Sequence, residues 1–348
     1  MNLTRPVKIF PALAAGALLA AALSADVVGT KNGSMLTGKI TRIDGTHVVL
    51  DTDFAGVVKI KQSEVVSLST DGPLNVRLAG GAVAEGALAP AGAPGGVRVA
   101  GGNGGVSTTV DKLAMTWAPG ATDPDVEARR RKWAYEAAAD ITGKTGNSEQ
   151  AGMAAHFRAT LASPSDSLQL YTAYERQVTD REKSADQFKA GADYQNNFAG
   201  RFSWYARDEG GFDRVKDIDL YNVAAAGLGY DILKTKADTL TGRVGLSHRY
   251  ENYGDPLADD LDSAGLDIGL NNQLVMAAWS MTNRVSYVPA FDDFANYRFF
   301  HESYIELPLK AGWWKIRIGV SNDYTSKPPA GREKLDTTYF TRLVLNWK

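Results

Sequence analysis

From residue 132 to the C-terminus, apolar and polar side chains alternate with a period of two. Trp133 and Tyr135 alternate with Lys132 and Glu136 at the start of this region, and aromatic residues recur at segment ends. Successive side chains of a strand point to opposite faces, so the pattern predicts strands with one apolar and one polar face. We expect twelve such strands, near residues 132–142, 150–162, 167–177, 186–196, 200–209, 219–232, 238–250, 262–271, 275–287, 297–307, 313–323 and 337–347.

The connections between these segments alternate in length. Short connections are expected at 163–166, 196–199, 233–237, 271–273 and 308–312, and longer, more charged ones at 179–185, 209–217, 252–261, 289–296 and 326–336. An even number of strands with short turns at one end and long loops at the other is typical of a transmembrane β-barrel. A soluble β-sandwich also alternates, but it does not combine this asymmetry with aromatic-ended apolar faces.

The preceding region, residues 26–118, is rich in Gly and Val and contains an internal repeat at an offset of 48 residues. The segment 32–40 aligns with 80–88, and without a gap Val49 then aligns with Val97 and Gly56 with Gly104. Each copy, 28–71 and 76–118, consists of short strand patterns separated by Gly turns. We therefore predict two small barrel-like modules of the SH3 kind. The fold class is all-β: a C-terminal antiparallel transmembrane barrel of about twelve strands, preceded by a small tandem-repeat β domain.

A linker is expected at 119–131. Pro119, Gly120 and Pro124 indicate a hinge, and the basic run 129–132 follows. Such a run lies against anionic lipid headgroups in some proteins, whereas in others it is only solvated. Of these two interpretations, the solvated segment is favoured.

Residues 1–25 have the layout of a secretory signal peptide. Arg5 and Lys8 precede an apolar run from Ile9 to Leu23, and small residues, Ser24 and Ala25, follow. This is the arrangement of a cleaved signal; the alternative is an uncleaved membrane anchor, for which the run is marginal in length. No later segment approaches 18 apolar residues, so we expect strands to cross the membrane. The predicted location is the bacterial outer membrane, with residues 26–118 in the periplasm.

Three segments of the barrel region resemble a known family. They are Gly146-Asn147-Ser148 after the first strand, the run Arg201 to Asp208, and Gly227-Leu228-Gly229-Tyr230. On these segments the chain resembles the salt-induced (YdiY-like) outer-membrane proteins, a domain of unknown function, over about residues 133–348. Ser148 departs from the Thr usual in the family, and the repeat region is an addition. The resemblance implies an outer-membrane barrel and no established activity.

The composition gives no sign of catalysis or cofactor binding. The formal net charge of −2 does not favour a nucleic-acid partner, and cysteine is absent. The four His residues form no metal-binding or catalytic motif, so we predict no cofactor, no metal and no enzymatic activity. The alternative is a barrel hydrolase, for which His248 is the candidate.

Alternation also identifies the side chains expected to face the barrel interior. They carry both signs of charge, with a slight basic excess that would favour anions. The predicted lumen-lining residues are Glu136, Asp140, His156, Arg158, Glu175, Lys189, Asp193, Arg201, Arg207, Arg243, Arg249, Asp267, Glu302, Glu306, Lys315, Arg317 and Arg342.

Two functions remain open on this basis. If the lumen charges segregate to opposite walls, the barrel is a narrow passive pore for small polar or anionic solutes. If they pair across the lumen, the barrel is a closed structural or envelope-stress protein whose periplasmic repeats bind an envelope partner. In either case the expected partners are outer-membrane lipid and the barrel-assembly machinery, the latter through the C-terminal strand residues Leu343, Leu345 and Trp347.

Overall fold

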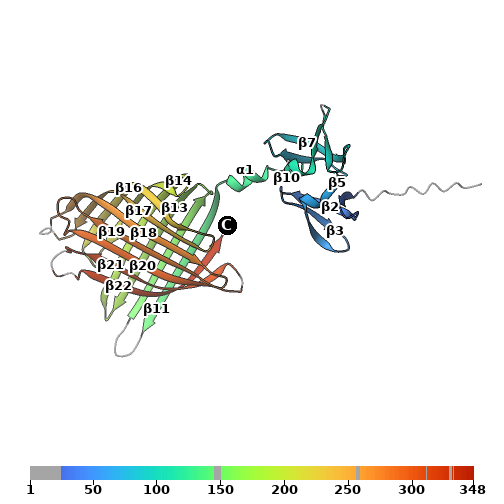
Figure 1. Cartoon of the computed structure of the whole chain (residues 1–348). Helices are drawn as coiled ribbons and strands as arrows, with labels where there is room; N and C mark the ends of the chain where they lie inside the picture. The colour runs from blue at the N-terminus through green and yellow to red at the C-terminus, as the bar shows by residue number, and fades with distance from the viewer. Residues whose placement is uncertain are drawn as a thin grey trace, which may run out of the picture. The chain divides into compact units, whose positions relative to one another are not determined.

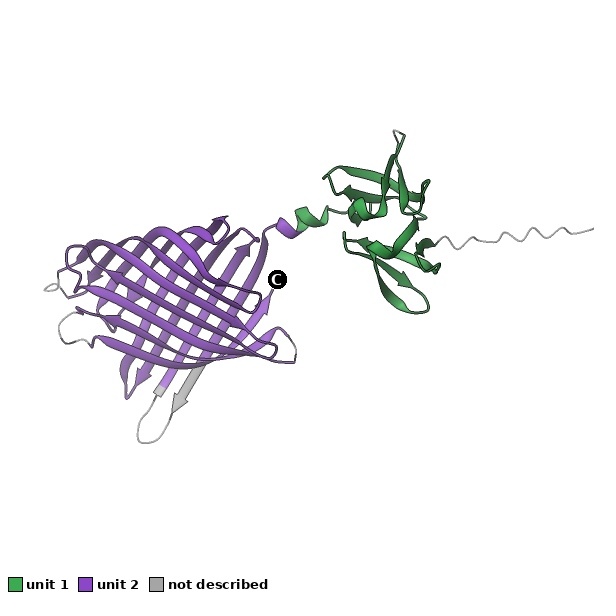
Figure 2. Cartoon of the chain, viewed as in Figure 1, with its two compact units in different colours: residues 1–127 green, residues 128–348 purple. Residues whose placement is uncertain are grey.

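The computed structural model describes residues 25–348 except 103, 145–149, 256–258, 311, 329–330 and 332; the side chains of 141–150 also lie outside the description. The predicted signal peptide and the Gly146-Asn147-Ser148 motif therefore fall outside the described residues. The chain divides into two compact units, Met1–Glu127 and Ala128–Lys348 (Figures 1 and 2). The division falls within the segment assigned to the linker.

The N-terminal unit contains two five-stranded antiparallel sheets with the same order of strands. The first has the order β4-β3-β2-β1-β5 and the second β10-β6-β7-β8-β9. A short 3-10 helix precedes the last strand of each copy, η1 at Gln62–Glu64 and η2 at Val110–Lys112. The strands are β1 Asp26–Thr30, β2 Met35–Ile43, β3 His47–Thr52, β4 Gly56–Lys61, β5 Val65–Ser69, β6 Leu74–Leu78, β7 Val83–Pro90, β8 Gly96–Ala100, β9 Val106–Thr109 and β10 Leu113–Trp117.

The two copies share one hydrophobic core, where two separate modules were expected. Fully buried Val28 and Leu50 of the first copy lie in the same cluster as Val76 and Leu113 of the second. The last strand of each copy packs on the other copy, β5 against β7 and β10 against β2. Each copy therefore buries apolar side chains in a core that the other copy helps to close.

Gln62 fastens the two copies together at their 3-10 helices. Its side chain is 4% exposed, and its amide Nε2 donates to the carbonyl oxygens of Val110 and, at 2.8 Å, of Leu113. Both acceptors belong to the other copy, 48 and 51 residues away. The side chain therefore satisfies two buried carbonyl groups across the repeat interface.

Replacing Gln62 with Ala is expected to lower the free energy of unfolding of residues 26–127 by about 1–3 kcal/mol, because two buried carbonyls lose their donor. Urea unfolding of this fragment can be followed by the fluorescence of Trp117, its single Trp. Lys112→Ala is the matched control, since Lys112 is exposed at the same helix of the second copy. Equal unfolding midpoints for the two variants would contradict this role of Gln62.

The segment expected to be a linker contains a helix, α1 (Pro124–Arg129), after Pro119 and Gly120. Asp123 caps it, because its Oδ1 accepts from the Asp125 backbone N–H at 2.9 Å. Pro124 occupies the first helical position, which tolerates the missing N–H. Arg77 on β6 pairs with Asp123 and Asp125. The hydrogen bond from Arg77 holds the pKa of Asp123 below its ordinary value.

The C-terminal unit is a closed antiparallel barrel of twelve strands, β11 to β22 in sequential order. All twelve predicted strands are present, and the fold class is confirmed. The strands are β11 Lys132–Lys144, β12 Gln150–Ala162, β13 Asp166–Thr179, β14 Glu182–Ala199, β15 Phe202–Asp213, β16 Ile218–Lys234, β17 Asp238–Tyr253, β18 Leu261–Val275, β19 Ser280–Pro289, β20 Tyr297–Pro308, β21 Trp314–Thr325 and β22 Leu335–Trp347.

Two connections expected to be long, 179–185 and 209–217, are short instead. β13 and β14 continue to a hairpin whose two residues, Asp180 and Arg181, have φ of 51° and 69°. Asp and Arg at positive φ in a two-residue loop match the turn that suits the twist of paired strands. The extra charged residues therefore extend the strands. Both chain ends of the barrel still lie at the same end as its short turns, which we call the turn end; the opposite end is the loop end.

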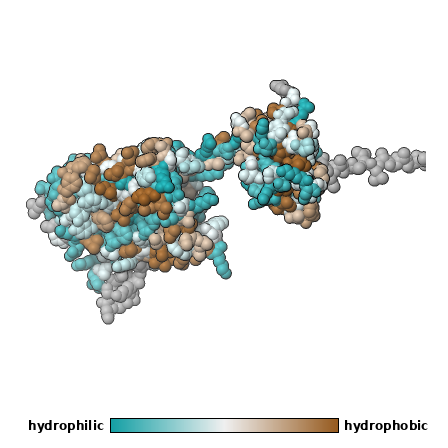
Figure 3. Space-filling view, in the orientation of Figure 1, coloured by the Kyte–Doolittle hydropathy of each residue, from teal (hydrophilic) through white to brown (hydrophobic). Residues whose placement is uncertain are grey.

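The outer surface of the barrel is apolar in its middle and aromatic toward both ends. Val244, Leu246 and Ile318 are each at least half exposed, and Figure 3 shows apolar side chains gathered on the barrel wall. At the turn end, Tyr135 stacks between Trp133 and Trp347 with ring centroids 5.9 and 5.5 Å apart. Aromatic rings flanking an apolar band are the pattern of a membrane-spanning barrel.

A loop-end aromatic group completes this pattern. The ring of Tyr297 lies 5.2 Å from Tyr287 and 5.5 Å from Tyr324, on three adjacent strands. Among the described residues, no helix has the length and apolar character needed to cross a membrane.

Candidate functional site: the barrel lumen

The interior of the barrel encloses a polar cavity of about 650 Å³. Side chains from all twelve strands line it, together with Lys216 of the β15–β16 loop. The described lining contains ten Lys or Arg and ten Asp or Glu residues. The basic excess expected from the sequence is therefore absent, because further inward-facing residues add more carboxylates than cations.

Most of the predicted lumen residues line this cavity. They are Glu136, His156, Arg158, Glu175, Lys189, Asp193, Arg207, Arg243, Arg249, Asp267, Glu302, Arg317 and Arg342. Asp140, Glu306 and Lys315 also point inward, covered by ion pairs with Arg342 and Arg317 or with each other. Arg201 does not line the cavity: it lies in the turn before β15, which begins at Phe202, and its exposed side chain donates to the carbonyl of Ile232 on β16.

A first group of ion pairs spans the seam where the barrel closes. β11 and β22 pair only from Tyr135–Trp347 to Ala139–Leu343, a much shorter register than β11 forms with β12. Arg317 on β21 reaches past β22 to Glu136 on β11 at 2.7 Å and also pairs with Glu306 on β20 at 2.5 Å. The bridge therefore reinforces the weakest strand pairing of the ring.

Arg342 adds a second bridge at the same seam. Its Nε donates to Asp140 on β11 at 2.9 Å, and its guanidinium lies 3.9 Å from Glu302 on β20. The planar guanidinium suits such multiple carboxylate contacts better than an ammonium would.

A second group fills the middle of the lumen along β14 to β18. Arg207 on β15 pairs with Asp267 on β18 at 2.6 Å, and the Tyr205 hydroxyl donates to the same carboxylate at 2.7 Å. Gly245 makes room for this contact, because a Cβ there would lie 2.7 Å from the Tyr205 oxygen. Arg243 on β17 pairs with Asp193 on β14 at 2.8 Å. Each of these pairs joins strands that are three apart in the ring.

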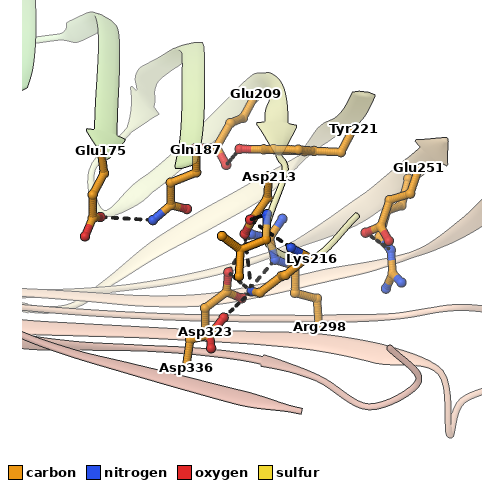
Figure 4. Close-up of polar contacts among 12 residues, drawn as sticks. Glu175, Gln187, Glu209, Asp213, Lys216, Tyr221, Glu251, Arg298, Asp323 and Asp336 are labelled. Atoms are coloured by element: carbon orange, nitrogen blue, oxygen red, sulfur yellow. Dashed lines mark hydrogen bonds and ion pairs between the residues drawn. The ribbon is translucent and has the colours of Figure 1, made fainter. Parts of the chain in front are cut away.

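Tyr171 uses a second glycine in the same way. A Cβ on Gly191 would lie 2.5 Å from the Tyr171 hydroxyl, which donates to Glu209 on β15 at 2.9 Å. Tyr221 on β16 donates to the other oxygen of Glu209 at 3.3 Å. Two phenols thus hold the Glu209 carboxylate in the lumen. Figure 4 shows the contact with Tyr221.

The third group crosses the loop-end mouth. Lys216 projects from the β15–β16 loop into the lumen, where its ammonium lies 3.2 Å from Asp323 on β21 and 2.9 Å from Asp336 on β22 (Figure 4). β15 and β16 are six positions from β21 and β22 in the twelve-stranded ring, so this ion pair joins opposite walls. We call Lys216, Asp323 and Asp336 the mouth bridge.

Both sides of the mouth bridge are held in place. Asp213 accepts the backbone N–H groups of Val215 and Lys216 at 3.1 Å each, which fixes the loop. On the other wall, Arg298 binds both oxygens of Asp323, at 3.1 and 2.9 Å. The bridge therefore narrows the mouth at a defined position.

Some lumen-lining residues that were not predicted carry a signal in the sequence, whereas others carry none. Glu209 and Asp323 lie at the last positions of the expected strands 200–209 and 313–323. They continue the inward alternation of Arg207 and Arg317, so the pattern already contained them. Lys216 lies in a loop and has no periodicity, and only the closed ring brings it to β21 and β22.

No histidine site for a metal appears among the described residues. His156 lines the cavity. His248 lies on the outer face, where its Nε2 is 2.8 Å from Asp262 Oδ1. This exposed pair is separate from the lumen.

The fold and its interior define a class: a membrane-spanning β-barrel with a charged, mostly ion-paired lumen. Residues 137–347 match the family described as "Protein of unknown function, DUF481", and the chain belongs to this family. It is the salt-induced (YdiY-like) family that the sequence resembles, so that prediction is confirmed. A search of curated proteins finds no match.

Several solved barrels are similar to this chain at low identity. The NanC porin is 10% identical over 62% of this chain and 99% of its own, with a TM-score of 0.36. The KdgM porin is 10% identical over 62% of this chain and 99% of its own, with a TM-score of 0.31. The translocator domain of the autotransporter NalP from Neisseria meningitidis is 11% identical over 63% of this chain and 88% of its own, with a TM-score of 0.32. At this level of similarity, neither a solute nor a partner can be carried over to this chain.

Proposed function

We propose that this protein forms a narrow outer-membrane pore for small polar or anionic solutes, with the N-terminal β domain in the periplasm. The observation that carries the proposal is the polar cavity of about 650 Å³ inside a barrel whose outer face is apolar. Charged side chains fixed by mutual ion pairs make a lumen polar without leaving it strongly charged. The pore needs no cofactor and performs no chemistry.

Export of the chain and its assembly into the membrane are proposed from the sequences of its N-terminal and C-terminal segments. A signal peptide at 1–25 would direct export. Leu343 and Trp347 on β22 face outward and are exposed, and half-buried Leu345 lies between them, an arrangement that the barrel-assembly machinery could engage. Outer-membrane lipid would then cover the apolar wall.

Swelling of proteoliposomes tests solute passage. The full-length protein should admit a pentose such as arabinose and largely exclude a trisaccharide such as raffinose, because the mouth bridge narrows the lumen. Folding is checked by the heat-dependent shift in gel mobility typical of barrels. Folded protein that swells no faster than empty liposomes in arabinose would contradict the proposal.

The second candidate is a closed barrel whose periplasmic repeats bind an envelope partner. The mouth bridge favours it, since an ion pair joins opposite walls of the lumen. Under this alternative arabinose would not enter, and residues 26–118 would recover a specific envelope component in a pull-down. Passage of arabinose through the wild-type barrel separates the two candidates.

A further inference from the structure

The lumen cations are almost completely neutralised by neighbouring carboxylates. Nine of the ten Lys and Arg residues that line the cavity have a carboxylate oxygen within 4.0 Å. Arg284 on β19 is the exception: among the described residues, no hydrogen bond or ion pair is formed by its guanidinium. No atom of this guanidinium is buried without a partner, so the group is open to the cavity, where an anion can reach it.

Arg284 faces the open part of the lumen. β19 lies opposite β13 in the ring, and Arg284 and Tyr171 of β13 both line the cavity. Lys189, on β14 beside Tyr171, crosses toward the same wall, where its ammonium lies 5.4 Å over the ring of Phe300 on β20. Its nearest carboxylate, Glu209, is 4.0 Å away and already receives two phenol hydrogen bonds. Lys189 is therefore only weakly held.

The unsatisfied polar atoms of the lumen point to the same kind of ligand. Among the described inward-facing residues, Nε of Arg158 and of Arg243 and Nδ2 of Asn346 are buried donors without a hydrogen-bond partner, whereas Asp140 Oδ1 is a buried acceptor without one. His156 Nε2 is likewise buried and unpartnered. These buried donors do not contact a ligand directly, but their partial positive charges make the wall more favourable for a ligand rich in acceptors. Carboxylates and phosphates are the strongest acceptors of charged donors.

We propose that Arg284, with Lys189, forms a binding position for small organic anions bearing carboxylate groups within the lumen. This inference rests on the proposed pore, for which it defines the solute class. The guanidinium binds one carboxylate through its planar fork, and the mobile ammonium of Lys189 binds a second acceptor. The paired cations set the polar wall and take no direct part.

A matched residue exists for the control. Glu175 lines the same cavity and accepts a hydrogen bond from Gln187 at 3.0 Å, and among the described residues no cation lies within 4 Å of it. Glu175→Gln removes one unpaired charge, as Arg284→Gln does, but of the opposite sign. Neither change leaves a buried ion-pair partner alone, so both variants should fold.

Equilibrium binding of succinate to the full-length protein, measured by titration calorimetry, tests the site without requiring conduction. Wild type and Arg284→Lys should bind succinate. The affinity of Arg284→Gln should be lower by about tenfold or more, as expected for the loss of a charged hydrogen bond. Glu175→Gln should bind at least as tightly as wild type, and 1,4-butanediol should not bind. Succinate binding that is absent, or unchanged in Arg284→Gln, would overturn the site.

The reversal potential in a tenfold KCl gradient provides the second readout. Relative to wild type, Arg284→Gln should shift the selectivity toward potassium, and Glu175→Gln should shift it toward chloride. A barrel that binds succinate through Arg284 but does not conduct would refute the pore and leave the site intact. A conducting barrel whose selectivity and succinate binding do not change in Arg284→Gln would support the pore and refute the binding site.

Discussion

Replacing Arg317 with Met is expected to lower the free energy of unfolding of the barrel by about 3–5 kcal/mol, because Glu136 and Glu306 each lose a charged hydrogen bond. Glu306 then keeps only Lys315, and Glu136 keeps only Arg158 at 3.7 Å. Arg317 is only 5% exposed in its side chain and bridges Glu136 and Glu306. Methionine keeps much of the side-chain length, so the loss reflects charge and hydrogen bonding more than packing. The seam between β11 and β22 should open first, since its register is so short.

Urea unfolding of the protein in lipid vesicles, followed by tryptophan fluorescence and gel mobility, measures this effect. Lys315→Ala is the control: Lys315 pairs with Glu306 but is more exposed, so its loss should cost much less. Combining Arg317→Met with Glu136→Gln and Glu306→Gln should recover part of the stability, because the buried charges then disappear together. An unchanged midpoint in Arg317→Met would show that the bridge does not hold the seam.

Replacing Lys216 with Ala is expected to raise the single-channel conductance, because it removes the mouth bridge between opposite walls. Asp323 keeps its bidentate contact with Arg298, and Asp336 is more than half exposed. Asp213, whose carboxylate lies 3.9 Å from the Lys216 ammonium, keeps its two hydrogen bonds from backbone N–H groups, so no carboxylate is left without a partner. The fold should therefore be preserved. The open mouth should also admit larger uncharged solutes in the swelling assay.

Lys183→Ala is the matched control for this change. Lys183 pairs with Asp186 at 2.7 Å near the same end of the barrel but does not line the cavity. It should leave the conductance unaltered. Equal conductance for Lys216→Ala and wild type would show that the narrowest part of the lumen lies elsewhere.

Sequence alternation was sufficient to predict the strands of the barrel. The period of two is dictated by lipid on one side and a polar interior on the other, so every strand carries the same signal. Strand ends were less certain, because above the apolar band both faces are polar. The alternation near Thr179 and Glu209 fades for that reason, and strands were mistaken there for loops.

The pairing of the lumen charges could not be predicted from alternation. Alternation says that Arg207 and Asp267 face inward, but their contact depends on the shear of the closed ring and on the space that Gly245 provides for Tyr205. The ion pairs of Lys216 are even harder to predict, since strand alternation does not indicate where the side chain of a loop residue points. The absence of an ion-pair partner for Arg284 cannot be predicted from the sequence either, because it depends on the positions of all the neighbouring carboxylates in the closed barrel.

The repeat domain shows the same division between local and tertiary information. The offset of 48 residues was readable, and the two sheets do share one strand order. The common core was not readable, because it depends on each copy's last strand packing against the other copy. Gln62 likewise acquires its role only at that interface.

The most direct test of the central claim, that the ion-paired lumen is a narrow open pore, is the single-channel conductance of the purified, folded wild-type protein in planar lipid bilayers. The structure predicts small, uniform current steps that grow when Lys216 is replaced with Ala. A folded barrel that gives no current steps, either as wild type or as Lys216→Ala, would contradict the claim and favour the closed barrel.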